Sequence, residues 1–176
     1  MTEKAPRLGS RLLIGAIAGF AGTLAMTAAM RRMHEKLPPL ERYPLTPREI
    51  VDSAAGDARS DAENETAKDV TTAAHFAYGA ATGALLGAAN VTMGPVSGGL
   101  AGVGVWLASY MGWIPGARLL KPAMDHPPRR NALMIAAHIV WGVTTARAMQ
   151  ELAVAREMIF NEGPDKDAPP EGGAER

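Results

Sequence analysis

The chain has 176 residues, its 18 Lys and Arg are balanced by 18 Asp and Glu, and 47% of its residues are hydrophobic. A formal net charge of zero provides no overall field to attract nucleic acid, and the absence of cysteine excludes disulfides, thiolate metal sites and a cysteine nucleophile. The length has room for a single compact helical domain.

Stretches without any charged residue dominate the chain. The hydrocarbon core of a bilayer needs roughly 20 apolar residues in a helix. The last stretch is short, but Arg147 can extend its guanidinium to the interface. The sequence therefore predicts an all-α polytopic membrane protein with four transmembrane helices. The uncharged stretches are Leu12–Met30, Val70–Gly94, Pro95–Ala117 and Asn131–Ala146, which give spans at about 12–30, 70–93, 96–115 and 131–147.

The first span follows a polar lead, residues 1–11. Arg31 and Arg32 stand where a signal peptide would have a small-residue cleavage site, so we expect a retained membrane helix. The Pro-rich stretch that follows should be extended. Thr46, Pro47 and Glu49 then have the pattern of a helix N-terminus with a capping box, which predicts a short interfacial helix at 47–56.

The acidic segment Asp57–Asp69 is interpreted as a solvated N-terminal extension of the second helix, where negative charge suits the helix dipole. A tight turn around Asn90–Val96 leads into the third span. The spans and their loops form one transmembrane domain, residues 12–155. The residues after it, 156–176, are polar and rich in Gly and Pro, and are predicted to be a disordered tail.

The second and fourth spans resemble each other. Each contains Ala-Ala-His, then an aromatic residue three positions after the His, a Gly four after and a Thr seven after. The first and third spans share a small-xxx-small pair, Gly15/Gly19 and Gly98/Gly102. We interpret this as two tandem helical hairpins with the same orientation, a parallel internal repeat. Chance similarity between two Ala- and Gly-rich membrane helices is the alternative.

Glycines at four-residue spacing are the strongest packing signal. Small residues let helix backbones approach closely in lipid, where hydrophobicity does not drive helices together. Packing within the chain is the favoured interpretation, and a homo-oligomer interface is the next. The predicted packing glycines are Gly15, Gly19, Gly79, Gly83, Gly87, Gly98 and Gly102.

Two intramembrane histidines are the main candidates for a functional site. An ionisable residue within a span is a functional hypothesis by default. On the plainer interpretation each imidazole is neutral and hydrogen-bonded inside the bundle. The alternatives are a proton-titrating pair, a haem held between two imidazoles, or a metal site that lacks the carboxylate zinc would need. The predicted polar face consists of His75, Tyr78 and Thr82 with His138, Trp141 and Thr145.

Met26, Met30 and Met33 form a stripe on the first helix. Thioethers can bind cuprous copper, but methionine is a common filler of apolar contacts, so packing is expected. Neither a metal site nor a cofactor is expected, apart from the haem alternative. No known catalytic motif occurs in the structural setting that it requires, so an enzyme is not expected.

Membrane orientation is predicted from the positive charges of the loops. More Lys and Arg residues, among them Arg31 and Arg32, lie on the side of the membrane reached after the first span, so the positive-inside rule favours that side as cytoplasmic.

The chain resembles the YagU-like family of small bacterial inner-membrane proteins of unknown function. The resemblance lies in the Gly- and Ala-rich first span with the Pro-rich stretch Leu37–Arg48, in His75 to Gly79, and in Ala137 to Gly142 with Arg147 behind it. The resemblance implies a bacterial inner-membrane location and the four-helix transmembrane architecture. It also implies that the loop after the first span faces the periplasm, whereas the positive-inside rule favours the cytoplasm for that loop.

The leading functional expectation is therefore a multi-pass, non-enzymatic structural or accessory component of the bacterial cytoplasmic membrane, with the lipid bilayer as its partner and no nucleic acid. A link to envelope or pH stress belongs to this expectation. The first alternative is a small proton or solute transporter or channel that uses His75 and His138. The second is a haem- or metal-binding membrane subunit.

Overall fold

The computed structural model describes residues 7–39, 42, 61–89 and 92–159. This part of the chain is all-helical and contains no strand, so the predicted all-α class is confirmed. The long helices are α1 (Leu8–His34), α3 (Asp61–Ala89), α4 (Pro95–Ala108) and α6 (Pro128–Ile159), and the short elements are η2 (Ser109–Trp113), α5 (Ile114–Gly116) and η3 (Ala123–Asp125). The interfacial helix expected at 47–56 lies outside the described residues.

The helix bounds differ from the predicted spans at several ends. α3 begins at Asp61, so the acidic segment before the second span is helical from that residue on. It ends at Ala89, and residues 92–94 belong to the turn before α4 instead of the span. α6 continues to Ile159, well beyond the predicted end at 147, because residues 148–159 contain no Gly or Pro and are rich in Ala, Glu and Met.

The segment predicted as the third span is one continuous helical run that contains a π-helical turn. α4 passes into the π-helical turn η2 and then into α5. The run closes with Leu119 N donating to Ile114 O at 3.2 Å and Arg118 N donating to Pro115 O at 2.9 Å. These two bonds form a Schellman motif, and Arg118 takes the left-handed position at φ 59° that glycine usually occupies.

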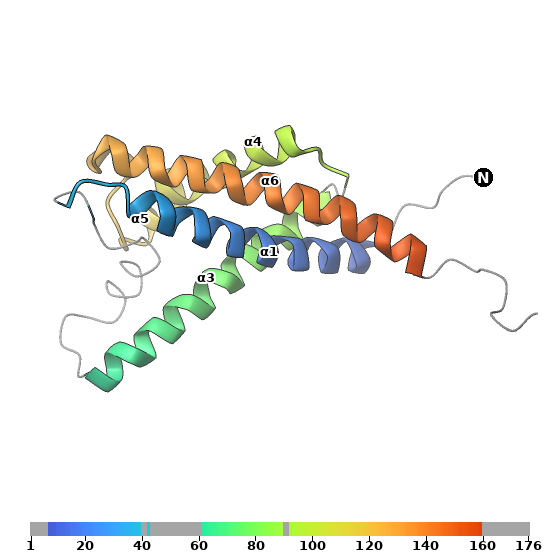
Figure 1. Ribbon diagram of the computed structural model, residues 1–176, viewed down its shortest axis with the longest axis horizontal. Coiled ribbons are helices and arrows are strands. Elements are labelled where there is room, and N and C mark those ends of the chain that lie inside the picture. The colour runs from blue at the N-terminus through green and yellow to red at the C-terminus, as the bar shows by residue number, and fades with distance from the viewer. Residues whose placement is uncertain (1–6, 40–41, 43–60, 90–91, 160–176) are drawn as a thin grey trace, which may run out of the picture.

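The long helices lie in the order α3, α1, α6, α4. α1 packs against α3 on one side and against α6 on the other, and α6 packs against α4. Figure 1 shows α1 and α6 running side by side and α3 leaving them at an oblique angle. α1 with α3 and α4 with α6 are therefore two helical hairpins that meet through α1 and α6.

Glycines form the contact surface inside each hairpin. A Cβ atom built on Gly83 would lie 2.6 Å from the Cα of Gly19, and one built on Gly87 would lie 2.8 Å from the Cα of Gly15. In the second hairpin a Cβ on Gly142 would lie 3.0 Å from the backbone N of Gly102. No side chain fits at these crossings, so backbone packs on backbone.

The two hairpins differ in register by about one helical turn. Gly15 of α1 faces Gly83 of α3, whereas its counterpart Gly98 of α4 faces Gly142 of α6. In the sequence repeat Gly142 corresponds to Gly79, four residues before Gly83. The pattern of small residues is thus repeated, while the helices that carry it are offset.

Side chains are sorted by size between the interior and the surface. Along the most apolar 18-residue windows of α1 and α6, only 39% and 44% of the residues are buried. The buried positions of α1 include Gly15, Ala18, Gly19 and Gly22. Large aliphatic and aromatic side chains of the same helix point outward, with Leu13 62%, Ile17 48%, Phe20 52% and Leu24 60% exposed.

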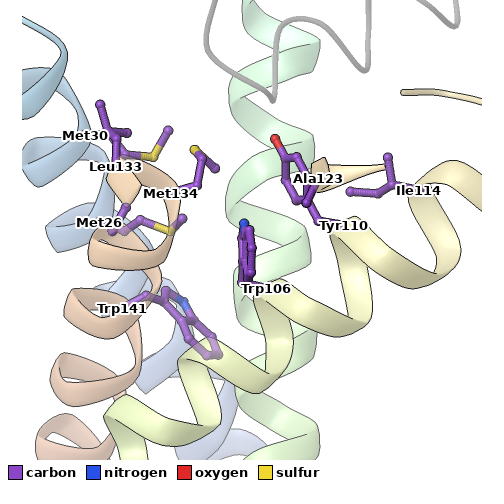
Figure 2. Close-up of a cluster of buried hydrophobic side chains, with 10 residues drawn as sticks. Met26, Met30, Trp106, Tyr110, Ile114, Ala123, Leu133, Met134 and Trp141 are labelled. Carbon is purple, nitrogen blue, oxygen red and sulfur yellow. The ribbon is translucent and has the colours of Figure 1, made fainter. Parts of the chain in front are cut away.

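A separate core of larger side chains lies beyond the glycine contacts, toward the C-terminal end of α1. Figure 2 shows methionines of α1 and α6 on one side of this core, with Trp106 of α4 and Tyr110 of η2 facing them. Met26 and Met30 are 5% and 2% exposed, and Met33 packs against the cluster. The methionine stripe of the first helix thus packs in the core, as its spacing predicts.

Two helices of the described part, α1 and α6, are long and apolar enough to cross a membrane. α3 is long enough, but Thr, His, Tyr and Gly residues and its charged first turns lower its hydropathy. α4 is apolar but spans only 14 residues before the π-helical turn.

We expect Gly83→Ala to destabilise the protein by about 1–3 kcal/mol, because the added methyl group meets the backbone of Gly19 and the hairpin must open. Thermal loss of helicity of the purified protein in a mild detergent measures this change.

Gly104→Ala is the matched control, because nothing lies within 4 Å of a Cβ built at that helical position. The control should be neutral or stabilising by up to about 1 kcal/mol through helix propensity. Equal effects of the two substitutions would contradict the glycine contact.

Candidate functional site

A small cleft opens where α1, α3, α4 and α6 converge. It has a volume of about 30 Å³, which is room for one or two water molecules. Its walls combine the predicted polar face with residues of α1 and α4. The lining residues are Thr23 and Met26 of α1, His75, Tyr78, Gly79 and Thr82 of α3, Val105 of α4, and His138 and Trp141 of α6.

His138 is held by the backbone of its own helix. Its side chain is 9% exposed, and Nδ1 lies 2.7 Å from the carbonyl oxygen of Met134, one turn earlier. A carbonyl oxygen only accepts, so Nδ1 carries the hydrogen and Nε2 carries the lone pair of the neutral ring. The helix thus fixes both the tautomer and the direction of this imidazole.

His75 is oriented by the first helix. Its Nε2 lies 3.3 Å from Oγ1 of Thr27, and that hydroxyl donates its own hydrogen to the carbonyl of Thr23 at 2.8 Å. The hydroxyl can therefore only accept from the ring, so Nε2 is the donor and Nδ1 carries the lone pair. In the neutral form of each ring, the nitrogen left to accept is Nε2 of His138 and Nδ1 of His75.

Trp141 joins α6 to α1 beside the cleft. Its Nε1 lies 3.2 Å from the carbonyl oxygen of Gly19 and 3.2 Å from Oγ1 of Thr23. Thr23 in turn donates to the Gly19 carbonyl at 2.8 Å. The indole N–H and the threonine hydroxyl are both satisfied although both side chains are buried.

Tyr78 joins α3 to the π-helical turn. Ser109 donates its hydroxyl hydrogen to the carbonyl of Val105 at 2.8 Å, so Tyr78 donates to Oγ of Ser109 at 2.8 Å. The Tyr78 oxygen accepts from Nε1 of Trp113 at 3.4 Å. π-helical turns recur at functional sites, and this one places Ser109 within hydrogen-bond distance of Tyr78 of α3.

Five of the six residues of the predicted polar face line the cleft, and Thr145 does not. It is 1% exposed and faces Gly22 of α1, where a Cβ would collide with its hydroxyl. Its Oγ1 finds no hydrogen-bond partner among the described residues. Thr82 stands at the same spacing from His75 and does line the cleft, so the spacing does not decide this, and Thr145 is excluded because it faces α1 at Gly22.

The predicted packing glycines all lie at helix contacts within the chain. Gly142 joins them, although the sequence analysis assigned it only to the repeat. Because these faces are already in contact inside one chain, a homo-oligomer has to use another surface.

Sequence reasoning missed the contribution of the first helix to the cleft. The predicted polar face did not include Thr23, and Met26 was expected to pack in the core, with cuprous copper binding as the less favoured interpretation. A signal existed, because Gly19, Thr23 and Thr27 stand at four-residue spacing and so share one face of α1. The other two histidines lie elsewhere, and His126 contacts the carbonyl of Lys121 through Nε2 at 3.1 Å.

The cleft does not fit a haem. Cofactor sites occupy about 300–1,000 Å³, an order of magnitude more than this cleft. Among the described residues no group of three or more His, Cys, Asp or Glu could hold a metal ion. The cleft can accommodate water, a proton or one small ion between neutral donors.

Comparisons with protein-family models, with curated proteins and with solved structures find no match to this chain. The resemblance to the YagU-like family therefore stays a prediction from the quoted residues.

Proposed function

We propose that the chain is a multi-pass protein of the bacterial cytoplasmic membrane, crossed by four helical segments, and that it acts as a non-enzymatic structural or accessory component. The observation that carries this proposal is the sorting of side chains by size. Glycine, alanine and threonine fill the close contacts between helix backbones, and the large side chains beside them on α1, Leu13, Ile17, Phe20 and Leu24, face outward.

This sorting suits lipid better than water. In water, contiguous exposed apolar side chains are an aggregation liability. In a bilayer the same side chains meet acyl chains, and close backbone contact supplies the association energy. The outward apolar residues are not confined to α1, since Leu85 of α3, Leu100 of α4 and Val154 of α6 are 69%, 69% and 57% exposed.

Segment length supports four crossings. At a rise of about 1.5 Å per residue, α1 and α6 reach about 40 and 48 Å, and the continuous run of residues 95–116 reaches about 33 Å. The hydrocarbon core is about 30 Å thick. α3 is longer than this core, so its charged first turns can lie outside it.

The end of the helix stack that carries α5 and η3 is proposed to face the cytoplasm. Arg31, Arg32, Arg118, Lys121 and Arg129 lie at that end. Such an excess of cations is typical of the cytoplasmic side. A link to envelope or pH stress is part of this proposal, because two imidazoles, whose charge changes near neutral pH, line the cleft.

Single-cysteine labelling tests the crossings, because the natural chain contains no cysteine. We expect Lys36→Cys and Met124→Cys to react with a membrane-impermeant maleimide from the cytoplasmic side, and Thr92→Cys to react only from the periplasmic side. Ile17→Cys, in the middle of α1, is the control and should not react from either side. Labelling of all three loop positions from one side would contradict the crossings by α3 and the third span.

A second candidate function is a path for protons or a small solute. It is favoured by one observation, that two histidines and a threonine hydroxyl from three helices line a cleft large enough for water. Imidazole is the side chain whose charge changes most readily near neutral pH.

For this second function we expect proteoliposomes to dissipate an imposed pH gradient, and the double variant His75→Ala/His138→Ala to lose at least about 90% of that flux. The change is expected because the variant removes both titratable rings from the cleft. His126→Ala, outside the cleft, is the control. Equal flux in the double variant and the wild type would exclude a path through these histidines.

A further inference from the structure

Three side chains of the cleft are donors of the kind that bind soft metal ions. Met26 comes from α1, His75 from α3 and His138 from α6. They come from three different helices, so the fold and not local sequence brings them together. Figure 2 shows Met26 extending from α1 into the space beside Trp141 and Trp106.

The hydrogen bonds leave both imidazoles ready to coordinate. Nδ1 of His138 donates to the Met134 carbonyl at 2.7 Å, which directs the lone pair to Nε2. Nε2 of His75 donates to Thr27 at 3.3 Å, which directs the lone pair to Nδ1. Metal-binding histidines almost always donate their second ring N–H to a carbonyl, carboxylate or water in this way.

The donor set selects the charge and softness of the ion. Two neutral imidazoles and one thioether supply no negative charge, and the other lining residues carry none. The cost of placing an ion in an apolar surrounding rises with the square of its charge, so a monovalent ion is favoured over a divalent one. Thioether and imidazole together suit Cu(I), whereas zinc sites use thiolate, more imidazoles or carboxylate.

We propose that the cleft binds one Cu(I) ion through the sulfur of Met26, Nδ1 of His75 and Nε2 of His138. A volume of about 30 Å³ accommodates a single ion with little rearrangement. The proposal requires no membrane crossing and does not depend on the proposed function, so it is testable in detergent solution whatever the topology.

The test is titration of the purified protein with Cu(I), kept reduced by ascorbate, in competition with bicinchoninate. Without any cysteine, the chain offers no thiolate to compete for the ion. The expected result is one Cu(I) per chain. Met26→Leu, His75→Ala and His138→Ala should each weaken binding about tenfold or more, since loss of even a second-shell partner costs that much.

Met30→Leu is the matched control, because Met30 is a buried methionine one turn from Met26 that does not line the cleft. It should bind Cu(I) within about twofold of the wild type. X-ray absorption is measured on the copper-loaded wild type, so its result does not depend on whether the variants fold. It should show both nitrogen and sulfur neighbours of the copper. No stoichiometric copper, a copper shell without sulfur, or equal losses in Met30→Leu and Met26→Leu would each overturn the proposal.

Discussion

The close approach of helix backbones at glycines is the constraint on which the rest of the structure depends. α1 is one of the two inner helices, and its Gly15 and Gly19 meet Gly83 and Gly79 of α3 without any side chain between them. Gly98 and Gly102 repeat this contact on α6. Dispersion and weak Cα–H···O contacts over such surfaces are small individually and add along the crossing.

Two consequences follow from these contacts. The glycine contacts leave no room for large side chains between the helix backbones, and Leu13, Ile17, Phe20 and Leu24 of α1 face outward beside them. Beyond the glycine contacts, larger polar side chains such as His75 and His138 lie between the helices. His75 stands one turn before Gly79 and His138 one turn before Trp141, and both Gly79 and Trp141 contact Thr23 of α1. Thr23 thus brings the two histidines to the same level, and the cleft forms there.

Much of the fold was predictable from the sequence, because charge-free stretches and glycine spacing are local signals. The helical class and the contact glycines follow from these signals, and spacing puts His75, Tyr78 and Thr82 on one face of α3 and His138 and Trp141 on one face of α6. That the two faces meet at one cleft does not follow from spacing. The contribution of Thr23 and Met26 to the cleft and the exclusion of Thr145 do not, since they depend on how α1 lies against α6. The one-turn offset between the two hairpins could not be predicted either, because a sequence repeat does not specify how two helices are aligned along each other.

Oxygen accessibility of spin labels along the outward face of α1 tests the central claim most directly. Nitroxides placed singly at Leu13, Ile17, Phe20 and Leu24 in reconstituted bilayers report whether lipid, water or protein covers that face. The account predicts that all four labels are relaxed efficiently by oxygen and poorly by a water-soluble nickel chelate. Efficient relaxation of these labels by the nickel chelate would place this face in water and contradict the account.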